Sequence, residues 1–257
     1  MSTVDNQNLF GFQAFENRTL ADLAFATIEK AIVTGQITAG SKISEVELAR
    51  TFGISRGSLR EALRRLEGRK LLQRVPHVGV HVVKLDARHV VDAFYVREAL
   101  EGIACQLAAE RMKEDELDEL QHILESHRQS EPVKRGDAYF QDAGNFDFHY
   151  RIAMGSRNTK LCDLLCEDFY YPMRVYRYQS GTTPGRAQEA IEQHDAILAA
   201  LRERDGARAE RLMRQHIADA RINLQSTLKL EGDNSAVASP DQKLQTDRNL
   251  PLLTALE

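Results

Sequence analysis

Apolar residues at helical spacing dominate the start of the chain. Residues 20–34 place alanine, leucine and isoleucine three and four positions apart, a period that predicts an amphipathic helix. Ser44 opens a Ser-Glu-Val-Glu capping box, so we expect a short second helix to begin there. Gly53 breaks that pattern, and Ser55 is placed to cap a third helix that continues to Lys70.

A different pattern follows the third helix. The β-prone runs LLQRV and VHVVKL flank a short segment, Pro76 to Gly79, and two such runs around a glycine-containing turn predict a β-hairpin. The segment QITAGSKI, between the first two helices, is expected to be a connection only. Three helices and a hairpin in this order predict a winged helix-turn-helix over residues 19–84.

From about Ala87 the apolar pattern is helical, and no β-prone run of comparable length interrupts it. We therefore expect a mainly α protein, in which an all-α bundle of about six helices over residues 85–230 follows the winged helix-turn-helix. The expected helices cover residues 87–112, 114–129, 136–156, 158–178, 185–203 and 205–230. Residues 1–18 show no period and are expected to form a flexible arm, while the polar residues 231–257 are expected to be a disordered tail.

Charge separates the two predicted domains. Residues 1–84 contain 12 lysines and arginines against 8 aspartates and glutamates, a net charge of +4, whereas the remaining residues contain 22 against 30, a net charge of −8. A basic first third joined to an acidic remainder indicates two different tasks. No apolar run is long enough to span a membrane, no secretory signal begins the chain, and three cysteines in helical patterns suit a reducing compartment. We therefore expect a cytoplasmic protein.

The third predicted helix is rich in arginine. Arg56, Arg60 and Arg64 lie four positions apart and therefore share one face, while apolar residues such as Leu59 and Leu63 occupy another. One face can thus pack on the domain while the other enters the major groove, where arginine pairs with guanine edges and phosphates. An arginine-rich face is also typical of an ordinary solvated helix, but the preceding helix, the tight turn and the hairpin favour DNA binding.

These residues resemble the GntR family of bacterial regulators. The resemblance rests on the stretch GISRGSLREALRRLE (53–67) and on the glycine of the hairpin turn, the wing. It implies a set of operator contacts on the recognition helix and the wing: Ser55, Arg56, Ser58, Arg60 and Gly79. In the implied arrangement the helix residues meet bases and phosphates, and the glycine allows the tip of the wing to enter the minor groove.

Two residues depart from the pattern of this family. Gly57 stands where the family often has proline or threonine, which removes a stiffening residue from the first helical turn. Lys70 stands where the family usually has glycine after the recognition helix. Because a left-handed cap costs a non-glycine residue about 1 kcal/mol, we expect this helix to end differently.

The predicted bundle is similar to the FCD domain, the ligand-sensing domain of FadR-like members of the same family. The similarity rests on YVREALEGIACQLAA (95–109), on FDFHYRIAMGSRNTKL (146–161) and on two late histidines, in this order behind the DNA-binding domain. In that subfamily the second domain dimerises and often binds a divalent metal together with a small carboxylate. The resemblance therefore implies a homodimer, a metal ion and a carboxylate effector.

The corresponding metal ligands are Asn145, His149, His194 and His216. Asn145 and His149 lie four positions apart and would share one face of the predicted helix 136–156, while the other two histidines come from later helices. Three helices can thus aim four side chains into one bundle, and imidazole suits zinc or nickel. Asn145 replaces the aspartate of the family pattern, which weakens the expected site because an amide oxygen is a neutral ligand. The alternative is that these histidines are ordinary polar or capping residues.

Arg97 lies in the first helix of the predicted bundle, and the resemblance places it near the effector pocket. A guanidinium that faces a bundle interior needs an anionic partner, and the carboxylate of a ligand would provide one. A salt bridge to Glu98, Glu101 or another acidic residue would serve equally well, so the sequence leaves both kinds of partner open.

Three functions are compatible with these features. We favour a bacterial transcription regulator that binds double-stranded operator DNA as a dimer and changes its affinity for DNA when a small carboxylate binds. A metal-dependent enzyme that uses the three histidines is a second hypothesis, but it leaves the basic helix unexplained. An architectural DNA-binding protein with an inert helical domain is the third, and the histidines argue against it.

Overall fold

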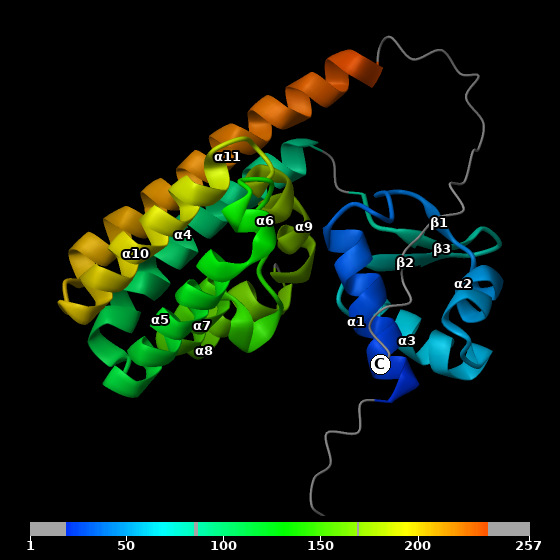
Figure 1. The fold of residues 1–257 in the computed structure, drawn as a ribbon, viewed down its shortest axis with the longest axis horizontal. Coiled ribbons are helices and arrows are strands. Elements are labelled where there is room, and N and C mark those ends of the chain that lie inside the picture. Colours follow the sequence, from blue (N-terminus) through cyan, green and yellow to red (C-terminus); the bar gives the residue numbers. More distant parts are fainter. Residues whose placement is uncertain (1–18, 85–86, 169, 236–257) are drawn as a thin grey trace, which may run out of the picture.

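The computed structural model describes residues 19–84, 87–168 and 170–235, which form two domains (Figure 1). The first domain contains three helices and a small sheet, and the described residues of the second form helices only. This arrangement confirms the expected mainly α protein, with a winged helix-turn-helix followed by an all-α domain. In the described part of the chain, no helix is long and apolar enough to cross a membrane. The expected arm, residues 1–18, lies outside the described residues.

A hydroxyl side chain caps each helix of the first domain. Thr19, Ser44 and Ser55 each accept a hydrogen bond from the backbone amide three positions further on. Such caps satisfy amides that have no partner within the helix, and they therefore fix where each helix begins. The three helices are α1 (Leu20–Val33), α2 (Glu45–Phe52) and α3 (Arg56–Gly68).

A three-stranded antiparallel sheet completes the first domain, with strand order β1-β3-β2. The strands are β1 (Lys42–Ile43), β2 (Leu72–Val75) and β3 (Gly79–Val82). The hairpin of β2 and β3 agrees with the sequence prediction, whereas β1 lies in the segment that was expected to be a connection only. Lys42 and Ile43 pair with His81 and Val80 of β3. Two residues are too few to show the period of a strand, so only the pairing with β3 identifies β1.

The apolar faces of these elements enclose one core. Leu59, Leu63 and Leu66 of α3 are fully buried in the same cluster as Ile28 of α1 and Val80 of β3. Burial of each such side chain contributes about 1.5–3 kcal/mol to stability. Because this packing uses one face of α3, the opposite face remains at the surface.

The end of α3 corrects one expectation from the sequence. Lys70 has a φ of 58°, in the left-handed region, and the Leu71 amide donates to the Leu66 carbonyl at 3.1 Å. These features form a Schellman motif, in which a lysine adopts the conformation usual for glycine. The prediction that this helix ends differently is therefore wrong. Leu66 and Leu71 are buried in the same core cluster, and their burial offsets the cost of about 1 kcal/mol for a non-glycine residue.

The second domain is formed by α4 (Ala87–Arg111), α5 (Glu114–Gln129), α6 (Glu131–Lys134), α7 (Phe148–Gly155), α8 (Thr159–Cys162), α9 (Tyr170–Gly181), α10 (Arg186–Arg202) and α11 (Gly206–Ser235). The long helices α4 and α11 lie side by side, and the others pack around them (Figure 1). Helix α11 continues to Ser235, beyond its expected end at residue 230. The rest of the expected tail, residues 236–257, lies outside the described residues.

The helix expected over residues 136–156 is wrong in its first half. Only α7 forms in this stretch, after a single 3-10 turn over Gly144–Phe146. Gly136 and Gly144 have positive φ values of 72° and 67°, which a helix does not contain. The side chain of Asp147 then caps α7. A helical period in the sequence does not reveal such turns, because glycine fits both conformations.

The helix expected over residues 158–178 is also divided. It consists of α8, a π-helical segment over Asp163–Asp168, and α9, which continues to Gly181. Pro172 lies in the first turn of α9, where the missing amide hydrogen has no helical partner to lose. The division makes α9 a separate element.

Helix α9 connects the two domains through its side chains. Tyr171 and Val175 pack against the apolar core of the first domain. The guanidinium of Arg69, the residue that ends α3, lies 4.0 Å from the centre of the Tyr171 ring. The guanidinium of Arg174 forms a buried ion pair with Glu29 of α1. The helical domain therefore contacts both α1 and the end of the recognition helix.

Candidate functional site

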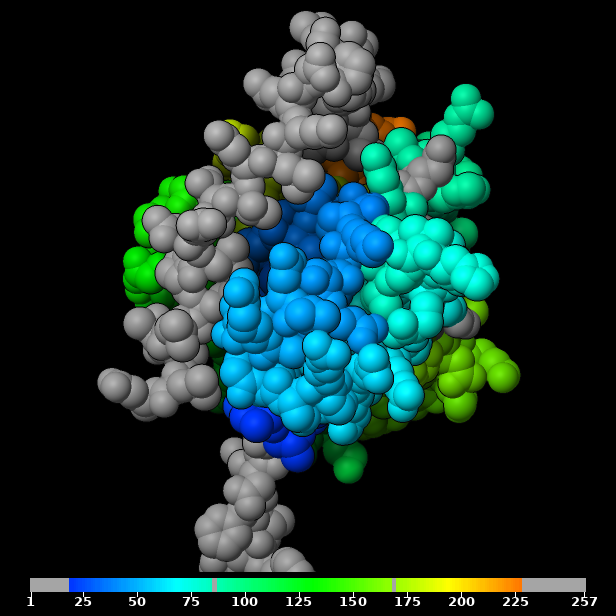
Figure 2. All heavy atoms as spheres, turned by 90° about the vertical axis from the view of Figure 1, so that its right-hand side faces the viewer, coloured from blue at the N-terminus to red at the C-terminus, as the bar shows by residue number. Residues whose placement is uncertain are grey.

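The exposed face of α3 has the composition of a DNA-binding surface. Arg56, Arg60 and Arg64 are all exposed. Ser55 caps the helix, and its hydroxyl oxygen lies 3.0 Å from that of Ser58. The structure thus brings the predicted recognition-helix residues together at the start of α3. The surface of the first domain, blue to cyan, is unobstructed by the helical domain on the side that Figure 2 turns to the reader.

Arg60 is held at this surface by a carboxylate that DNA can replace. Arg60 donates to Glu45 at 3.0 Å, and Arg74 of β2 donates to the same carboxylate at 3.3 Å. The hydrogen bond from Arg60, partly opposed by burial, lowers the pKa of Glu45 below its ordinary value. Exposed ion pairs contribute about 0–1 kcal/mol. A phosphate or a base edge can therefore take Arg60 from Glu45 at little cost.

Gly79 shapes the wing. Residues 76–78 form its exposed tip, and Gly79 pairs with Val75 where the tip joins the two strands. Gly79 has a φ of 118°, and a Cβ atom there would lie 3.2 Å from Cε of Lys42. The turn therefore requires glycine, and residues 76–78 form the part of the wing that projects beyond it.

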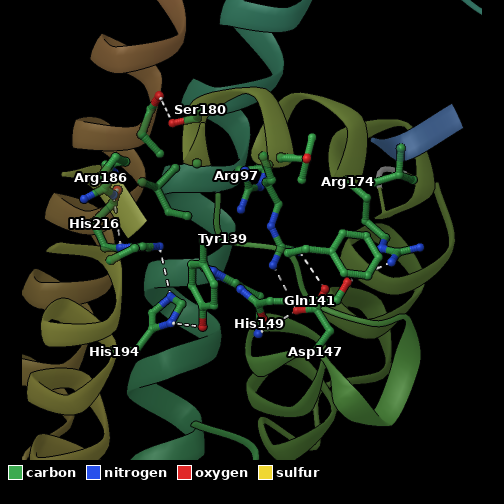
Figure 3. Close-up of a pocket in the computed structure, with 18 residues that line it drawn as sticks. Arg97, Tyr139, Gln141, Asp147, His149, Arg174, Ser180, Arg186, His194 and His216 are labelled. Atoms are coloured by element: carbon green, nitrogen blue, oxygen red, sulfur yellow. Dashed lines mark hydrogen bonds and ion pairs between the residues drawn. The ribbon is translucent and has the colours of Figure 1, made fainter. Parts of the chain in front are cut away.

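A pocket lies mainly in the second domain, against α9, and Val33 of the first domain contributes to its lining (Figure 3). Its lining is rich in basic side chains, namely Arg97, Arg174, Arg177, Arg186, His149, His194 and His216. Asp147 is the acidic side chain among the lining residues. Because most of these groups are buried, each charge needs a partner in the protein or in a ligand.

Three histidines meet at one end of the pocket: His149 of α7, His194 of α10 and His216 of α11. Their ligand atoms lie within 4.8 Å of one another, and all three side chains are buried. Burial lowers the pKa of His149 below the ordinary value of histidine, and it lowers those of His194 and His216 well below it. The rings are therefore neutral near pH 7, which is the state in which imidazole binds a metal.

A chain of hydrogen bonds fixes which nitrogen of His194 is protonated. His127 Nε2 lies 3.1 Å from the carbonyl oxygen of Phe146, which only accepts, so this nitrogen donates. Burial lowers the pKa of His127, so its Nδ1 is an acceptor and receives the hydrogen bond of the Tyr139 hydroxyl at 3.0 Å. The Tyr139 oxygen in turn accepts from His194 Nδ1 at 3.0 Å. His194 Nε2 therefore keeps a free lone pair.

The other two rings are fixed in the same way. His149 Nδ1 lies 2.6 Å from a carboxylate oxygen of Glu101. Burial acts to raise the pKa of this carboxyl, but the charge of Arg97 and the hydrogen bond from His149 outweigh burial and hold the pKa well below its ordinary value. His216 Nδ1 lies 2.7 Å from the amide oxygen of Gln193 and 3.4 Å from the Arg186 guanidinium, and the shorter contact, to an atom that only accepts, makes this nitrogen a donor. Both Nδ1 atoms thus donate to acceptors, and both Nε2 atoms keep their lone pairs.

Three Nε2 lone pairs are consequently available at this end of the pocket. His194 Nε2 and His216 Nε2 lie 3.1 Å apart, a distance at which two lone pairs repel unless a cation lies between them. Two nitrogens bound to one zinc ion at about 2.0–2.1 Å are separated by roughly 3.3 Å at the tetrahedral angle. Metal-bound histidines also usually donate their second nitrogen to a carboxylate, carbonyl or similar acceptor, as these do. The three side chains can therefore hold a divalent metal ion.

Asn145 does not join the three histidines. It lies in the 3-10 turn before α7, is exposed and does not line the pocket. The expectation that Asn145 and His149 share a helix face is wrong, because α7 begins only at Phe148. The buried carboxylate of this segment belongs to Asp147, which accepts two hydrogen bonds from Arg177. Burial opposes ionisation of Asp147, but the charge of Arg177 outweighs it and lowers the pKa to about 2.

Arg97 joins the site with one donor left over. Its Nε donates to Glu101 at 2.7 Å, and both side chains are buried, so the salt bridge that the sequence left open is present. The buried Nη1 atom of Arg97 has no hydrogen-bond partner among the described residues. A buried donor without a partner costs about 1–3 kcal/mol. A carboxylate in the pocket would remove this cost.

Sequence patterns do not single out Arg174, Arg177 or Tyr139. These residues lie in or next to the two stretches where the predicted helices are divided, so no helical period places them on an inner face. Among the further residues of this site, the sequence points to Glu101, because it follows Arg97 by four positions, the spacing of an ion pair within a helix.

Two protein families match this chain. Residues 20–82 match the bacterial regulatory proteins of the gntR family, and residues 92–219 match the FCD domain. The first match contains the arginine-rich helix and the wing, and the second contains the three histidines and Arg97.

Curated regulators of transcription are similar to the chain over most of its length. It is 30% identical over 200 residues to the "Probable D-xylose utilization operon transcriptional repressor" of Paenarthrobacter nicotinovorans, which spans 78% of this chain and 86% of the relative. It is 27% identical over 195 residues to the HTH-type transcriptional repressor RspR of Escherichia coli (strain K12), which spans 76% of this chain and 84% of the relative.

Solved structures share the fold. E. coli McbR/YncC matches with a TM-score of 0.60 at 23% identity, over 84% of this chain and 99% of that chain. A GntR regulator from Rhodococcus sp. RHA1 matches with a TM-score of 0.61 at 16% identity, over 80% and 97%. At these identities the likeness concerns the fold alone. From the two family matches and the similarity to curated repressors, the chain belongs to the GntR family of bacterial regulatory proteins, and it is a DNA-binding transcription regulator with an FCD ligand-binding domain rather than an enzyme.

Proposed function

We propose that this regulator binds its operator as a homodimer and that a small carboxylate, bound in the pocket beside a divalent metal ion, changes its affinity for the operator. Zinc is the metal that three histidines suit best, and nickel is the alternative. Binding of the effector shifts the population between two arrangements of the DNA-binding domains, which requires that the effector binds one arrangement more tightly.

The approach of His194 Nε2 and His216 Nε2 to 3.1 Å is the observation that supports this proposal most directly. Tyr139 and Gln193 hold the Nδ1 atoms of the two rings as donors, so neither ring can turn its protonated nitrogen towards the other without losing a buried hydrogen bond. A metal ion bound there would supply positive charge and an open coordination position for a carboxylate.

Arg97 is the proposed contact for the carboxylate of the effector. Its guanidinium lines the pocket, and its Nη1 atom is the donor without a partner. Glu101 holds the other side of the guanidinium through Nε, so the free donor is already in place before a ligand enters. Such preorganisation strengthens binding because little side-chain freedom is lost.

On the DNA side, the proposed contacts are those implied by the family: Ser55, Arg56, Ser58, Arg60 and the wing that Gly79 shapes. The helix begins with free amides and a serine cap, a suitable site for a phosphate, and the arginines beyond it face the groove. A dimer would place two such helices on the two half-sites of a pseudo-palindromic operator.

Zinc titration of the chelator-treated protein tests the metal part of this proposal. The wild type is expected to bind one zinc ion per chain. Loss of a residue that only hydrogen-bonds to a metal ligand typically weakens metal binding by roughly 10–100-fold. His194→Ala removes a ligand itself, so its zinc affinity should fall by more than that. His122→Ala, which removes an exposed histidine of α5, is the matched control and should bind as the wild type does. Equal zinc affinity in both variants would contradict the assignment.

A thermal unfolding series tests the effector part separately. Monocarboxylates from acetate to hexanoate are expected to raise the Tm of the zinc-loaded wild type, because they bind the folded state only. In Arg97→Gln the shift, measured from the Tm of that variant alone, should disappear while zinc binding persists. An unchanged shift would remove Arg97 from the effector site.

A further inference from the structure

One arginine of the pocket belongs to the contact between the two domains. Arg174 of α9 lines the pocket and is only 5% exposed. Its Nη2 atom donates to the carbonyl oxygen of Gln141 at 2.8 Å, and its Nη1 atom pairs with Glu29 of α1. Residues 29 and 174 lie in different domains, so the pocket and the domain interface share this guanidinium.

Glu29 links the same contact to the recognition helix. Its side chain is buried, and its second carboxylate oxygen lies 3.7 Å from the guanidinium of Arg69, which ends α3. Val33, at the end of α1, is itself one of the residues that line the pocket. The first domain thus forms part of the pocket wall, and a row of charged groups leads from the pocket to the end of α3.

Each end of the pocket holds an arginine, because Arg186 lies beside His216 and Arg174 lies at the opposite end. Figure 3 shows His194 and His216 on one side and Arg174 on the other, next to the blue helix of the first domain. Arg97 lies between them with its unpartnered donor. A ligand anchored at the histidine end can therefore reach a second cationic side chain, Arg174, within the same pocket. Without a ligand, Arg174 pairs with Glu29.

We propose that the Arg174 end of the pocket is a second anion subsite, and that an effector with two anionic groups takes Arg174 from Glu29 and loosens the contact between α1 and α9. This inference rests on the proposed function, because the first anionic group occupies the site assigned there to the histidines and Arg97. It adds the chemical class of the effector, a dianion such as a dicarboxylate, and the contact through which the effector acts on the DNA-binding domain.

The competition follows from the chemistry of the groups. A guanidinium presents a planar fork that pairs with one carboxylate through two parallel hydrogen bonds, so a ligand carboxylate on Arg174 displaces Glu29. A second carboxylate beside buried Glu29 also adds a like charge in a site that water does not screen. Glu29 then pairs with Arg69 alone, and α1 and α9 lose their buried ionic contact. Because the dianion and Glu29 compete for Arg174, removal of the Glu29 carboxylate should tighten binding of the dianion.

Calorimetric titration of the zinc-loaded protein with dicarboxylates from malonate to adipate, each beside the monocarboxylate of the same length, tests this inference. At least one dicarboxylate is expected to bind the wild type at least about fivefold more tightly than its monocarboxylate, a typical size for such coupling. Arg174→Gln and Arg174→Lys should lose this advantage, since neither side chain presents the fork. Glu29→Gln should increase it, whereas a residue that only supports the fold would not tighten binding when replaced.

Glu189→Gln is the matched control. It removes the carboxylate that pairs with Arg186, another arginine of the pocket, on α10 of the second domain, and it should leave the advantage of the dicarboxylate unchanged. Hydrogen exchange supplies the second measurement, because the winning dicarboxylate should speed exchange of the amides of residues 29–33 in the wild type and not in Arg174→Gln.

The inference is overturned if no dicarboxylate binds more tightly than its monocarboxylate, if the advantage survives both replacements of Arg174, or if Glu29→Gln does not increase it. Each of these results leaves the proposed function standing as long as monocarboxylate binding still depends on Arg97. If the wild type bound no monocarboxylate at all, that result would instead contradict the proposed function itself.

Discussion

The two functional regions of this regulator are both rich in arginine, but they hold it in opposite ways. The three arginines on the outer face of α3 are exposed. Arg97, Arg174 and Arg186 in the pocket are at most 5% exposed, and each is paired with a carboxylate of the protein. The difference reflects where each partner comes from. DNA brings its own phosphates to an exposed cation, whereas a buried cation is costly unless the protein supplies an anion.

This contrast explains how the two regions can respond to different molecules. Exposed ion pairs such as that of Arg60 with Glu45 are weak, so DNA can take this arginine without disturbing a buried contact. A ligand of the pocket must either use a donor that the protein leaves over, as at Arg97, or displace an internal partner, as at Arg174. The second way changes contacts within the protein directly, and it is open only to a ligand of the buried region.

Replacement of an arginine by alanine should lower the free energy of unfolding much more in the pocket than on the exposed face of α3, and this is the largest effect that we expect. Arg97→Ala leaves Glu101 buried without its main cationic partner, and we expect the free energy of unfolding to fall by about 3–5 kcal/mol. Arg64→Ala removes an exposed arginine and should change stability by less than about 0.5 kcal/mol. Urea unfolding of both variants measures the difference, and comparable losses in the two would break the contrast between the regions.

Operator affinity should show the reverse order. Arg60→Ala is expected to weaken binding to a selected operator duplex by about 1–3 kcal/mol, because Arg60 leaves Glu45 for a base edge or phosphate. Arg128→Ala, an equally simple loss of a surface arginine on α5, is the control and should bind normally. Fluorescence anisotropy at fixed salt measures both constants. Full affinity in Arg60→Ala would exclude it from the DNA interface.

Removal of the Tyr139 hydroxyl should have a smaller effect, limited to zinc affinity. Tyr139→Phe removes the oxygen that accepts from His194 Nδ1, so this ring is no longer held with its lone pair on Nε2. We expect zinc affinity to fall by roughly 10–100-fold, the usual effect of losing such a partner. Tyr178→Phe, another tyrosine of the pocket, should bind zinc as the wild type does. Competition with a zinc-binding dye distinguishes the two results.

The smallest effect is expected at the start of α1. Hydrogen bonds from Arg65 and Thr19 lower the pKa of Asp22 from 3.8 to about 2. Because the folded state binds this proton less readily than the unfolded state, the contribution of Asp22 is fully present above about pH 4 and is lost as pH falls towards 2. The stability difference between the wild type and Asp22→Asn should therefore shrink between pH 5 and pH 3. A difference that stays constant over this range would show that ionisation of Asp22 is irrelevant.

Local signals in the sequence explain most of the first domain. The serine caps, the glycine of the wing and the period of Leu59, Leu63 and Leu66 each depend on neighbours within a few residues, and all lie as expected. Where conformation depends on distant contacts, the sequence predicts less. Strand β1 exists only because β3 lies beside it, and Lys70 adopts a left-handed φ because the leucines around it pack into the core.

The pocket was predictable in its histidines and not in its surroundings. His149, His194 and His216 come from three helices that the sequence places correctly enough to bring the rings together. Asn145 was expected beside them because a regular helix was expected through positive-φ Gly144. The pair of Arg174 and Glu29 spans 145 positions of the chain, and no pattern of spacing within one element relates such residues.

The affinity of the zinc-loaded protein for a selected operator, with and without a carboxylate that binds the pocket, tests the central claim most directly. Coupling between the pocket and the DNA-binding face predicts a change of at least about fivefold in the wild type, and no change in His194→Ala at the same carboxylate concentration. An operator affinity that stays constant while calorimetry shows the wild-type pocket filled would contradict the account, because the two regions would then act independently.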